Sequence, residues 1–161
     1  MKTNLYLLLL ILLVSCSTKK VTTTTPKPSK PKVIETETVS AWDFKENKNL
    51  TLSQIFDQAK AQKKLVFVDA YATWCAPCKL MDKEVFTDKI AAKFFNDNFI
   101  SYKLNIEKNN GETVKLLYSI DVLPTLLFLD ADGNVLKKVE NSITTTMLKA
   151  AAQEALRKAK K

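Results

Sequence analysis

The stretch Leu65–Lys79, LVFVDAYATWCAPCK, decides the fold of this chain. Its first half belongs to a nearly continuous apolar run, Lys64–Tyr71, which is typical of a strand that is buried on both faces. Two cysteines follow, Cys75 and Cys78, and helix-like sequence begins near Pro77. At a helix start, backbone N–H groups and the helix dipole stabilise a thiolate, and Cys78 is close enough to form a disulfide with Cys75. The spacing therefore predicts dithiol–disulfide chemistry at a strand-to-helix junction.

The sequence from residue 41 to residue 161 predicts one α/β domain with a single core. A capping box at Thr51 starts the first helix, and Asp130–Asn134 is a turn that lacks the ligand pattern of a calcium loop. The predicted order is α-β-α-β-α-β-β-α, which requires a mixed central sheet with helices on both faces. After the first helix we expect strand Lys64–Tyr71, helices Pro77–Phe86 and Asp88–Asn96, strand Phe99–Ile106, helix Thr113–Ser119, strands Thr125–Asp130 and Val135–Val139, and a last helix from Thr144–Thr146 to about Lys158.

The N-terminus has the pattern of an export signal. Met1-Lys2 gives a basic start, and the apolar run Leu5–Val14 is about ten residues long, whereas a membrane-spanning helix needs roughly 20. The run ends in Leu13-Val14-Ser15-Cys16, which resembles the lipobox of bacterial lipoproteins, where cleavage precedes a lipid-bearing cysteine. We predict a lipoprotein signal peptide over residues 1–15 and lipidation of Cys16. The alternative is an ordinary signal peptide with a chance cysteine.

Residues 16–40 are predicted to be a disordered tether that begins at the lipid-attachment cysteine. The segment 17–40 holds seven threonines, three prolines and five lysines, with few bulky apolar side chains. Such a segment cannot bury enough surface to offset the entropy lost on ordering. We expect Trp42 and Phe44, which follow the tether, to pack the start of the domain onto its body.

The amino-acid composition excludes several classes of site. The 161 residues include no histidine, which rules out Cys–His and Ser–His–Asp catalysis and zinc sites that contain histidine. The chain has three cysteines, so lipid on Cys16 would leave only Cys75 and Cys78 as thiols. The net charge is +8, but no basic patch interleaved with aromatic residues is present, so we predict no nucleic-acid partner.

Three separated motifs resemble the thioredoxin family, and the resemblance extends over about residues 50–158. The similar segments are Phe67–Lys79 for the active-site strand and redox motif, Lys103–Ile106 for the following strand, and Val122–Thr125 for the cis-proline loop. The resemblance implies a thioredoxin fold. The segment Met81–Asp88 is similar to the exported branch, which includes the periplasmic C-terminal domain of the membrane thiol–disulfide interchange protein. Ala76 departs from the glycine that is usual in thioredoxins, at a position that helps to tune the redox potential.

The chemistry of the motif, read with this resemblance, gives each residue a role. Cys75 is expected to be the exposed nucleophile, and Cys78 the resolving thiol, buried one turn into the helix. Pro77 stiffens the first turn, where its missing N–H is tolerated, and Trp74 shields the disulfide and offers a flat docking surface. The residues expected to bind substrate are Trp74, Ala76, Pro77, Leu123 and Pro124.

Two charged residues are predicted to assist catalysis. Asp69 lies within an apolar strand, where a carboxylate is costly unless it is paired or protonated, and the resemblance implies that it accepts the proton of the Cys78 thiol. Lys103 is its expected partner. The alternatives are an Asp69 that reaches solvent and an exposed strand lysine. The Leu123–Pro124 bond is expected to be cis and to present backbone groups to a substrate strand, the alternative being a trans proline at strand entry.

These features predict a membrane-tethered thiol–disulfide oxidoreductase of the cell envelope that faces the periplasm or the exterior and needs no cofactor or metal. Reduction of disulfides in exported proteins is the favoured direction, because Ala76 and Pro77 carry no cation that would stabilise the thiolate strongly. An upstream dithiol electron donor in the membrane would be its second partner. An oxidase or isomerase is the nearest alternative, followed by a copper(I) carrier that uses both thiolates and by a tethered adaptor that only docks clients.

Overall fold

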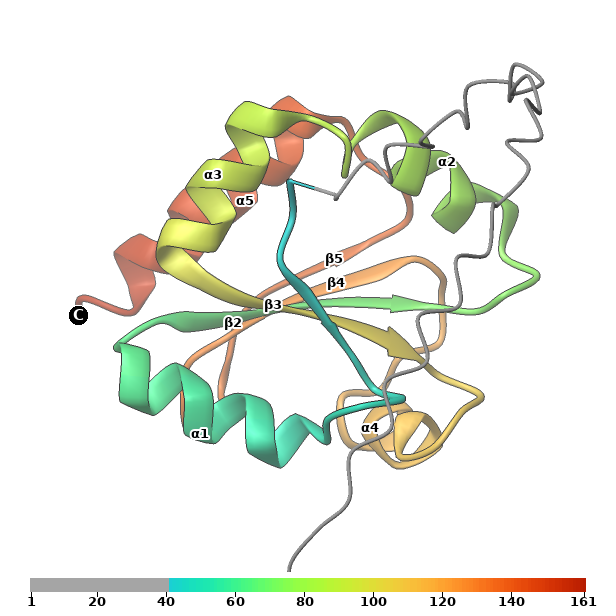
Figure 1. Cartoon of the computed structure of the whole chain (residues 1–161), viewed down its shortest axis with the longest axis horizontal. Coiled ribbons are helices and arrows are strands. Elements are labelled where there is room, and N and C mark those ends of the chain that lie inside the picture. The colour runs from blue at the N-terminus through green and yellow to red at the C-terminus, as the bar shows by residue number, and fades with distance from the viewer. Residues whose placement is uncertain (1–40) are drawn as a thin grey trace, which may run out of the picture. The chain divides into compact units, whose positions relative to one another are not determined.

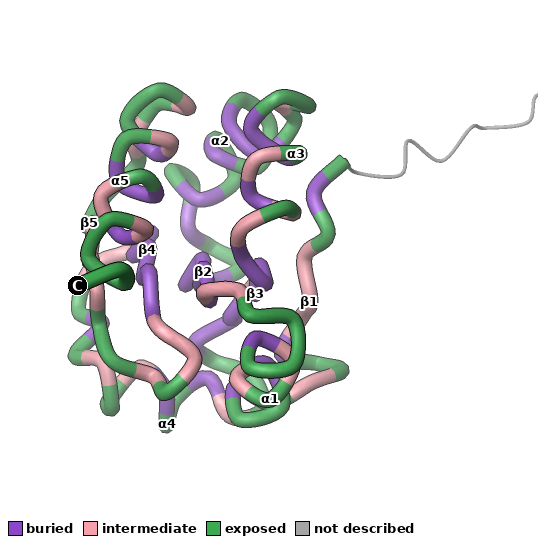
Figure 2. The backbone as a smooth tube through the Cα atoms, turned by 90° about the vertical axis from the view of Figure 1, so that its left-hand side faces the viewer, coloured by how far each residue is buried: buried purple, intermediate pink, exposed green. Residues whose placement is uncertain are grey.

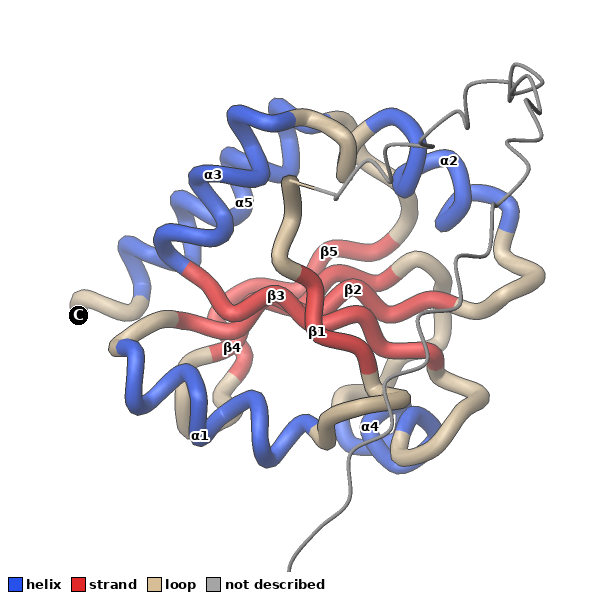
Figure 3. The backbone as a smooth tube through the Cα atoms, in the orientation of Figure 1, coloured by secondary structure: helices blue, strands red, loops and turns tan. Residues whose placement is uncertain are grey.

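Five strands form one mixed sheet in the order β1-β3-β2-β4-β5 in the computed structural model, which describes residues 41–161 (Figures 1 and 3). β1 and β2 run parallel to β3, whereas β4 runs antiparallel to β2 and β5 antiparallel to β4. The central strands β2 and β4 are buried along almost their whole length, as their apolar sequences predict (Figure 2). The strands are β1 (Phe44–Glu46), β2 (Leu65–Tyr71), β3 (Phe99–Asn105), β4 (Thr125–Leu129) and β5 (Val135–Glu140).

Helices cover both faces of this sheet. α1 and α4 lie on one face, and α2, α3 and α5 lie on the other (Figure 1). Thr51 caps α1 in a capping box with Gln54, and Asp88 and Thr144 cap α3 and α5. The Asp88 cap explains why α2 and α3 are separate helices. The helices are α1 (Leu52–Gln62), α2 (Ala76–Glu84), α3 (Lys89–Asn98), α4 (Gly111–Leu117) and α5 (Thr145–Lys158).

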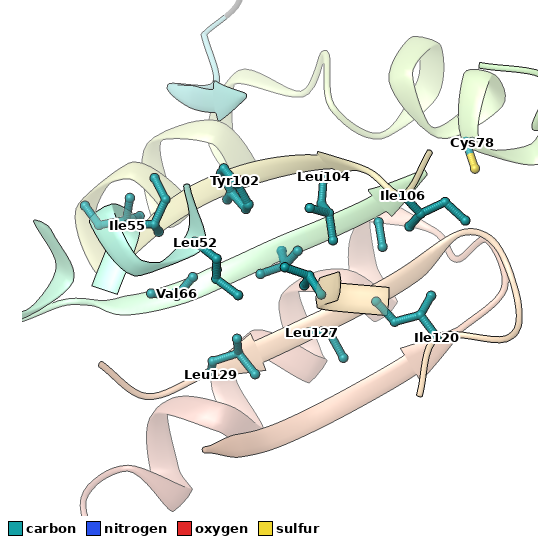
Figure 4. Close-up of a cluster of buried hydrophobic side chains, with 14 of the residues drawn as sticks. Leu52, Ile55, Val66, Cys78, Tyr102, Leu104, Ile106, Ile120, Leu127 and Leu129 are labelled. Atoms are coloured by element: carbon teal, nitrogen blue, oxygen red, sulfur yellow. The ribbon is translucent and has the colours of Figure 1, made fainter. Parts of the chain in front are cut away.

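Each face of the sheet has its own hydrophobic cluster. Val66 and Val68 of β2 pack on the α1 side, in a cluster that continues to the two cysteines, and Figure 4 shows the Cys78 sulfur at its end, near Ile106. On the other face Phe67 packs in an aromatic cluster, 4.9 Å from Phe95 between ring centroids. Because side chains alternate along a strand, Asp69 is directed to the same face as Phe67, beneath α2.

The structure confirms the mixed sheet with helices on both faces but adds a strand that the predicted order omitted. β1 has three residues and pairs only with β3, so it is too short for hydrophobic periodicity to reveal. The expected packing of Trp42 and Phe44 is confirmed, since Trp42 is buried and the two rings stack with centroids 5.3 Å apart. β1 therefore fastens the start of the domain to its body.

Residues 1–40 lie outside the described residues, and with them the predicted signal peptide, Cys16 and the tether. Among residues 41–161, every helix is too short or too polar to cross a bilayer. The signal peptide, the lipidation of Cys16 and the tether therefore stay predictions.

Candidate active site

The two cysteines of the motif form a disulfide at the N-terminus of α2. Their Sγ atoms are 2.01 Å apart and their Cα atoms 5.3 Å apart. Cys75 is the N-cap of α2, and its sulfur accepts a hydrogen bond of 3.2 Å from the backbone N–H of Cys78. Ala76 and Pro77 form the first turn, where proline removes no helical hydrogen bond. After reduction, the same N–H group and the helix dipole are placed to stabilise a thiolate on Cys75.

The prediction that Cys75 is exposed is wrong for this disulfide form. Its exposed fraction is 2%, close to the 3% of Cys78. The sulfur is bonded to Cys78 and held against the first turn of α2, and the residue packs with the cluster on the α1 face. Solvent reaches Cys75 through a hollow of about 390 Å³ that it helps to line. We call this space the substrate hollow; its other walls are Trp74, Ala76, Pro77, Ile106, Lys115, Ile120, Asp121 and Leu123.

Most of the residues predicted to bind substrate meet at this hollow. Trp74, Ala76, Pro77 and Leu123 line it, and Trp74 is 64% exposed, as a docking surface requires. Pro124 is buried, and the Leu123–Pro124 peptide bond is cis, as predicted. Two charged wall residues, Lys115 and Asp121, were missed. They lie in and after a short helix whose sequence does not show which side faces the cysteines.

Trp74 is held by a carboxylate that the sequence analysis also missed. Its indole Nε1 donates a hydrogen bond of 2.7 Å to Oε1 of Glu107, in the loop between β3 and α4. The available signal was the position of Glu107 two residues after the end of β3, because β3 runs parallel to β2 and the carboxyl ends of parallel strands share one edge of the sheet. The hydrogen bond fixes the indole as one wall of the substrate hollow.

Asp69 is buried and paired with Lys103, as predicted. Its exposed fraction is 2%, its Oδ2 lies 2.7 Å from Lys103 Nζ, and the two residues are opposite each other in the β2–β3 register. Lys103 also binds Asp82 of α2, a partner that the sequence did not reveal. Asp82 lies four residues after Cys78, and therefore on the same side of the helix. Lys103 thus connects the buried carboxylate to the helix that carries the second cysteine.

Both ionisable groups of the Asp69–Lys103 pair have raised pKa values. Burial raises the pKa of Asp69, although the neighbouring Lys103 ammonium opposes that shift. Burial alone would lower the pKa of Lys103, but Asp69 and Asp82 outweigh it, so the pKa of Lys103 is raised. Lys103 Nζ also lies 5.4, 4.9 and 5.1 Å from the ring centroids of Phe44, Tyr71 and Phe86, which suits a cation. Asp69 can therefore hold a proton at a pH at which a surface aspartate has lost it.

Comparison with known proteins places these features in a family. The family model described as thioredoxin-like matches residues 46–131, a segment that contains the disulfide, the Asp69–Lys103 pair and the cis proline. This chain belongs to the thioredoxin-like family. A candidate disulphide-isomerase from Bacteroides thetaiotaomicron has a similar structure, with a TM-score of 0.63 and 31% identity over 71% of this chain and 93% of that one. The oxidised C-terminal domain of DsbD from Neisseria meningitidis has a TM-score of 0.55 at 15% identity, covering 65% of this chain and 91% of that one, a likeness of fold alone.

Curated relatives match about half of this chain. The thiol:disulfide interchange protein DsbD of Tatumella citrea is 40% identical over 78 residues, which is 47% of this chain and 13% of that protein. Thioredoxin-T of Drosophila melanogaster is 36% identical over 77 residues, which is 48% of this chain and 45% of that protein. The chain thus spans less than half the length of these relatives. The thioredoxin fold and the likeness to the DsbD C-terminal domain, both predicted from the sequence, are confirmed.

Proposed function

We propose that this protein is a membrane-tethered thiol–disulfide oxidoreductase that reduces disulfides in exported proteins. The observation that carries the proposal is the Cys75–Cys78 disulfide at a helix N-terminus, at the edge of an apolar hollow open to solvent. The buried Asp69 beneath α2 adds a group that can accept a proton. Membership of the thioredoxin-like family supports the same chemistry.

The reduced protein would act in two exchange steps. The Cys75 thiolate attacks one sulfur of a substrate disulfide and forms a mixed disulfide, and the other substrate sulfur leaves as a thiolate that takes a proton from solvent. Cys78 then gives its proton to Asp69 and attacks Cys75 Sγ, which releases the second substrate sulfur as a thiolate. That thiolate takes a proton from solvent, and Asp69 returns its own proton to solvent. Two electrons pass to the substrate, and the Cys75–Cys78 disulfide forms. A dithiol donor must reduce that disulfide before the next cycle.

The charges around the cysteines support the reducing direction. A strong oxidant needs a strongly stabilised thiolate, and Ala76 and Pro77 supply no cation. The substrate hollow contributes one cation and one carboxylate, Lys115 and Asp121, whose fields oppose each other. We expect equilibration with glutathione buffers to give a reduction potential closer to about −270 mV than to about −120 mV. A reduction potential closer to about −120 mV would favour the oxidase alternative.

A lipid on Cys16 is proposed as the membrane attachment, with the domain outside the cytoplasm. The apolar run that ends in Leu13-Val14-Ser15-Cys16 and the Thr- and Pro-rich segment 17–40 support this arrangement. The partners are then disulfide-containing exported proteins and a membrane dithiol donor. A copper(I) carrier would have to bind the metal through the two cysteines alone, because the described part of the chain holds no group of three or more His, Cys, Asp or Glu side chains that could bind a metal.

Lys115 is expected to favour substrates with an acidic residue near the reacting disulfide. It is half-buried in the wall of the substrate hollow and has no ion-pair partner within residues 41–161. Lys115→Glu should lower kcat/KM about tenfold for a peptide disulfide with acidic neighbours and change it within about twofold for a neutral peptide. Lys89→Glu on α3 makes the same change in net charge away from the hollow and serves as the control. If kcat/KM for the acidic peptide fell equally in the two variants, net charge alone would explain the effect, and Lys115 would have no specific role.

A further inference from the structure

One loop shapes two walls of the substrate hollow. This loop, residues 106–110, joins β3 to α4. Ile106 lines the hollow directly, and Glu107 holds the indole of Trp74, which is a second wall. Whatever fixes this loop therefore also fixes the shape of the hollow beside Cys75.

Asn47 holds the loop from a distant part of the sequence. It follows β1, is 7% exposed, and its Nδ2 donates hydrogen bonds of 2.9 Å to the backbone carbonyls of both Asn105 and Lys108. Its Oδ1 accepts a hydrogen bond of 3.3 Å from the backbone N–H of Asn105, and its carbonyl accepts one of 3.0 Å from the side chain of Asn109. One buried amide thus satisfies backbone groups on both sides of Glu107.

The loop itself is tightly closed, so a shift at Asn47 would reach Glu107. The Asn105 side chain accepts a hydrogen bond of 3.0 Å from the backbone N–H of Glu107, and the Ile106 N–H donates one of 3.0 Å to the carbonyl of Tyr71 in β2. A Cβ on Gly111 would lie 2.0 Å from the Asn105 carbonyl oxygen, which leaves no room for any other residue. The Asn105 side chain thus holds the backbone of Glu107, and Asn105 is itself held by Asn47 and by its register with Tyr71 of β2.

We infer that Asn47, far from the redox motif in sequence, is a positioning residue that orients the Trp74 wall of the substrate hollow through the loop and Glu107. The inference rests on the proposed function in one respect, that the hollow receives substrate. Truncation of Asn47 removes its side-chain hydrogen bonds to the N–H and carbonyl of Asn105, at the end of β3, and to the carbonyl of Lys108 in the loop. Glu107 can then move away from the indole, whereas the disulfide, α2 and Asp69 stay in place. Substrate binding weakens, and the steps at the sulfur atoms keep their rates.

The two tryptophans of the chain allow a direct test. Each indole N–H gives its own peak in a ¹H–¹⁵N spectrum, and Trp74→Phe assigns the Trp74 peak. Asn47→Ala should shift the Trp74 peak toward its position in Glu107→Ala. The same variant should raise KM for a peptide disulfide roughly fivefold, change kcat by less than about twofold, and leave the reduction potential at the wild-type value.

Asn96→Ala is the matched control, because Asn96 fastens the chain just before β1 instead of just after it. Its Nδ2 donates to the Ala41 carbonyl at 2.8 Å, and its Oδ1 accepts from the Asp43 N–H at 3.1 Å. This variant should disturb the peak of Trp42, which lies next to these groups in sequence, more than that of Trp74. Asn109→Gly is a milder second variant, because glycine tolerates the φ of 53° at that position; it should shift the Trp74 peak in the same direction as Asn47→Ala.

The outcomes separate this inference from the proposed function. An unchanged Trp74 peak in folded Asn47→Ala and Asn109→Gly, or an equal rise of KM in Asn96→Ala, overturns the inference. If the wild-type protein reduces no disulfide, the proposed function is wrong, and the Trp74 peak still decides whether Asn47 positions the indole.

Discussion

Cys75→Ser is expected to abolish disulfide reduction, and Cys78→Ser to accumulate a stable mixed disulfide with substrate. Cys75 lines the substrate hollow at the N-terminus of α2, so it is the sulfur that a substrate can reach. Cys78 lies one turn further along and is not among the residues that line the hollow. Without the first sulfur the rate should fall roughly a thousandfold or more. Without the second, attack still occurs but the adduct cannot be resolved.

Intact-protein mass spectrometry of the reduced variants, mixed with a peptide disulfide, measures both effects. Cys16→Ser in all samples removes the third thiol of the chain, so that every adduct is assigned to the motif. The Cys75→Ser, Cys78→Ser double variant is the control and should form no adduct. Stable adducts through Cys78 in the Cys75→Ser variant, with none in Cys78→Ser, would reverse the assigned roles.

The parts of the site that lie on regular elements could be predicted from the sequence. The buried strand, the motif at the helix start and the Asp69–Lys103 pair all follow from strand periodicity and from the family resemblance, because neighbouring strands bring fixed residues opposite each other. The caps at Thr51, Asp88 and Thr144 are local signals of the same kind.

The residues that were missed act across loops or between elements. Asp82 meets Lys103 only because α2 lies over that part of the sheet, and Glu107 meets Trp74 only because two loops end at one edge. Asn47 contacts residues about 60 positions away, after a three-residue strand that no periodicity could show. The burial of Cys75 likewise depends on the disulfide geometry and on packing with the α1 face, not on its place in the motif.

Asp69→Asn is expected to slow resolution of the mixed disulfide and, at the same time, to make the folded protein more stable. As a proton acceptor, Asp69 should accelerate the attack of Cys78 on the mixed disulfide by roughly 100-fold, while the attack of Cys75 on substrate needs no such acceptor. Stopped-flow measurement of the two steps should show the loss in the second step alone. Unchanged rates for both steps between about pH 6 and pH 8 would show that Asp69 is not the base.

The stability change follows from the direction of the pKa shift. Because burial raises the pKa of Asp69 in the folded state, the fold favours the protonated carboxyl. This contribution to stability is complete below the ordinary pKa of aspartate and is lost as the pH rises through the raised pKa. Asparagine is never ionised, and Asp82 stays paired with Lys103, so the variant should be more stable than the wild type at neutral pH, and the gap should close in acid.

Asp82→Asn separates proton transfer from the loss of a charge beside Lys103. Asp82 is a second carboxylate on Lys103, but its side chain is 43% exposed, whereas that of Asp69 is 2% exposed. Urea unfolding at neutral pH should therefore show no comparable gain for Asp82→Asn, and its resolution step should slow far less. If both variants gained similar stability and slowed the resolution step similarly, the negative charge beside Lys103 would be the cause. Proton transfer to Asp69 would then not be. If only Asp69→Asn raises the stability and slows resolution of the mixed disulfide, Asp69 serves catalysis. Its burial as a carboxylate then lowers the stability of the folded protein.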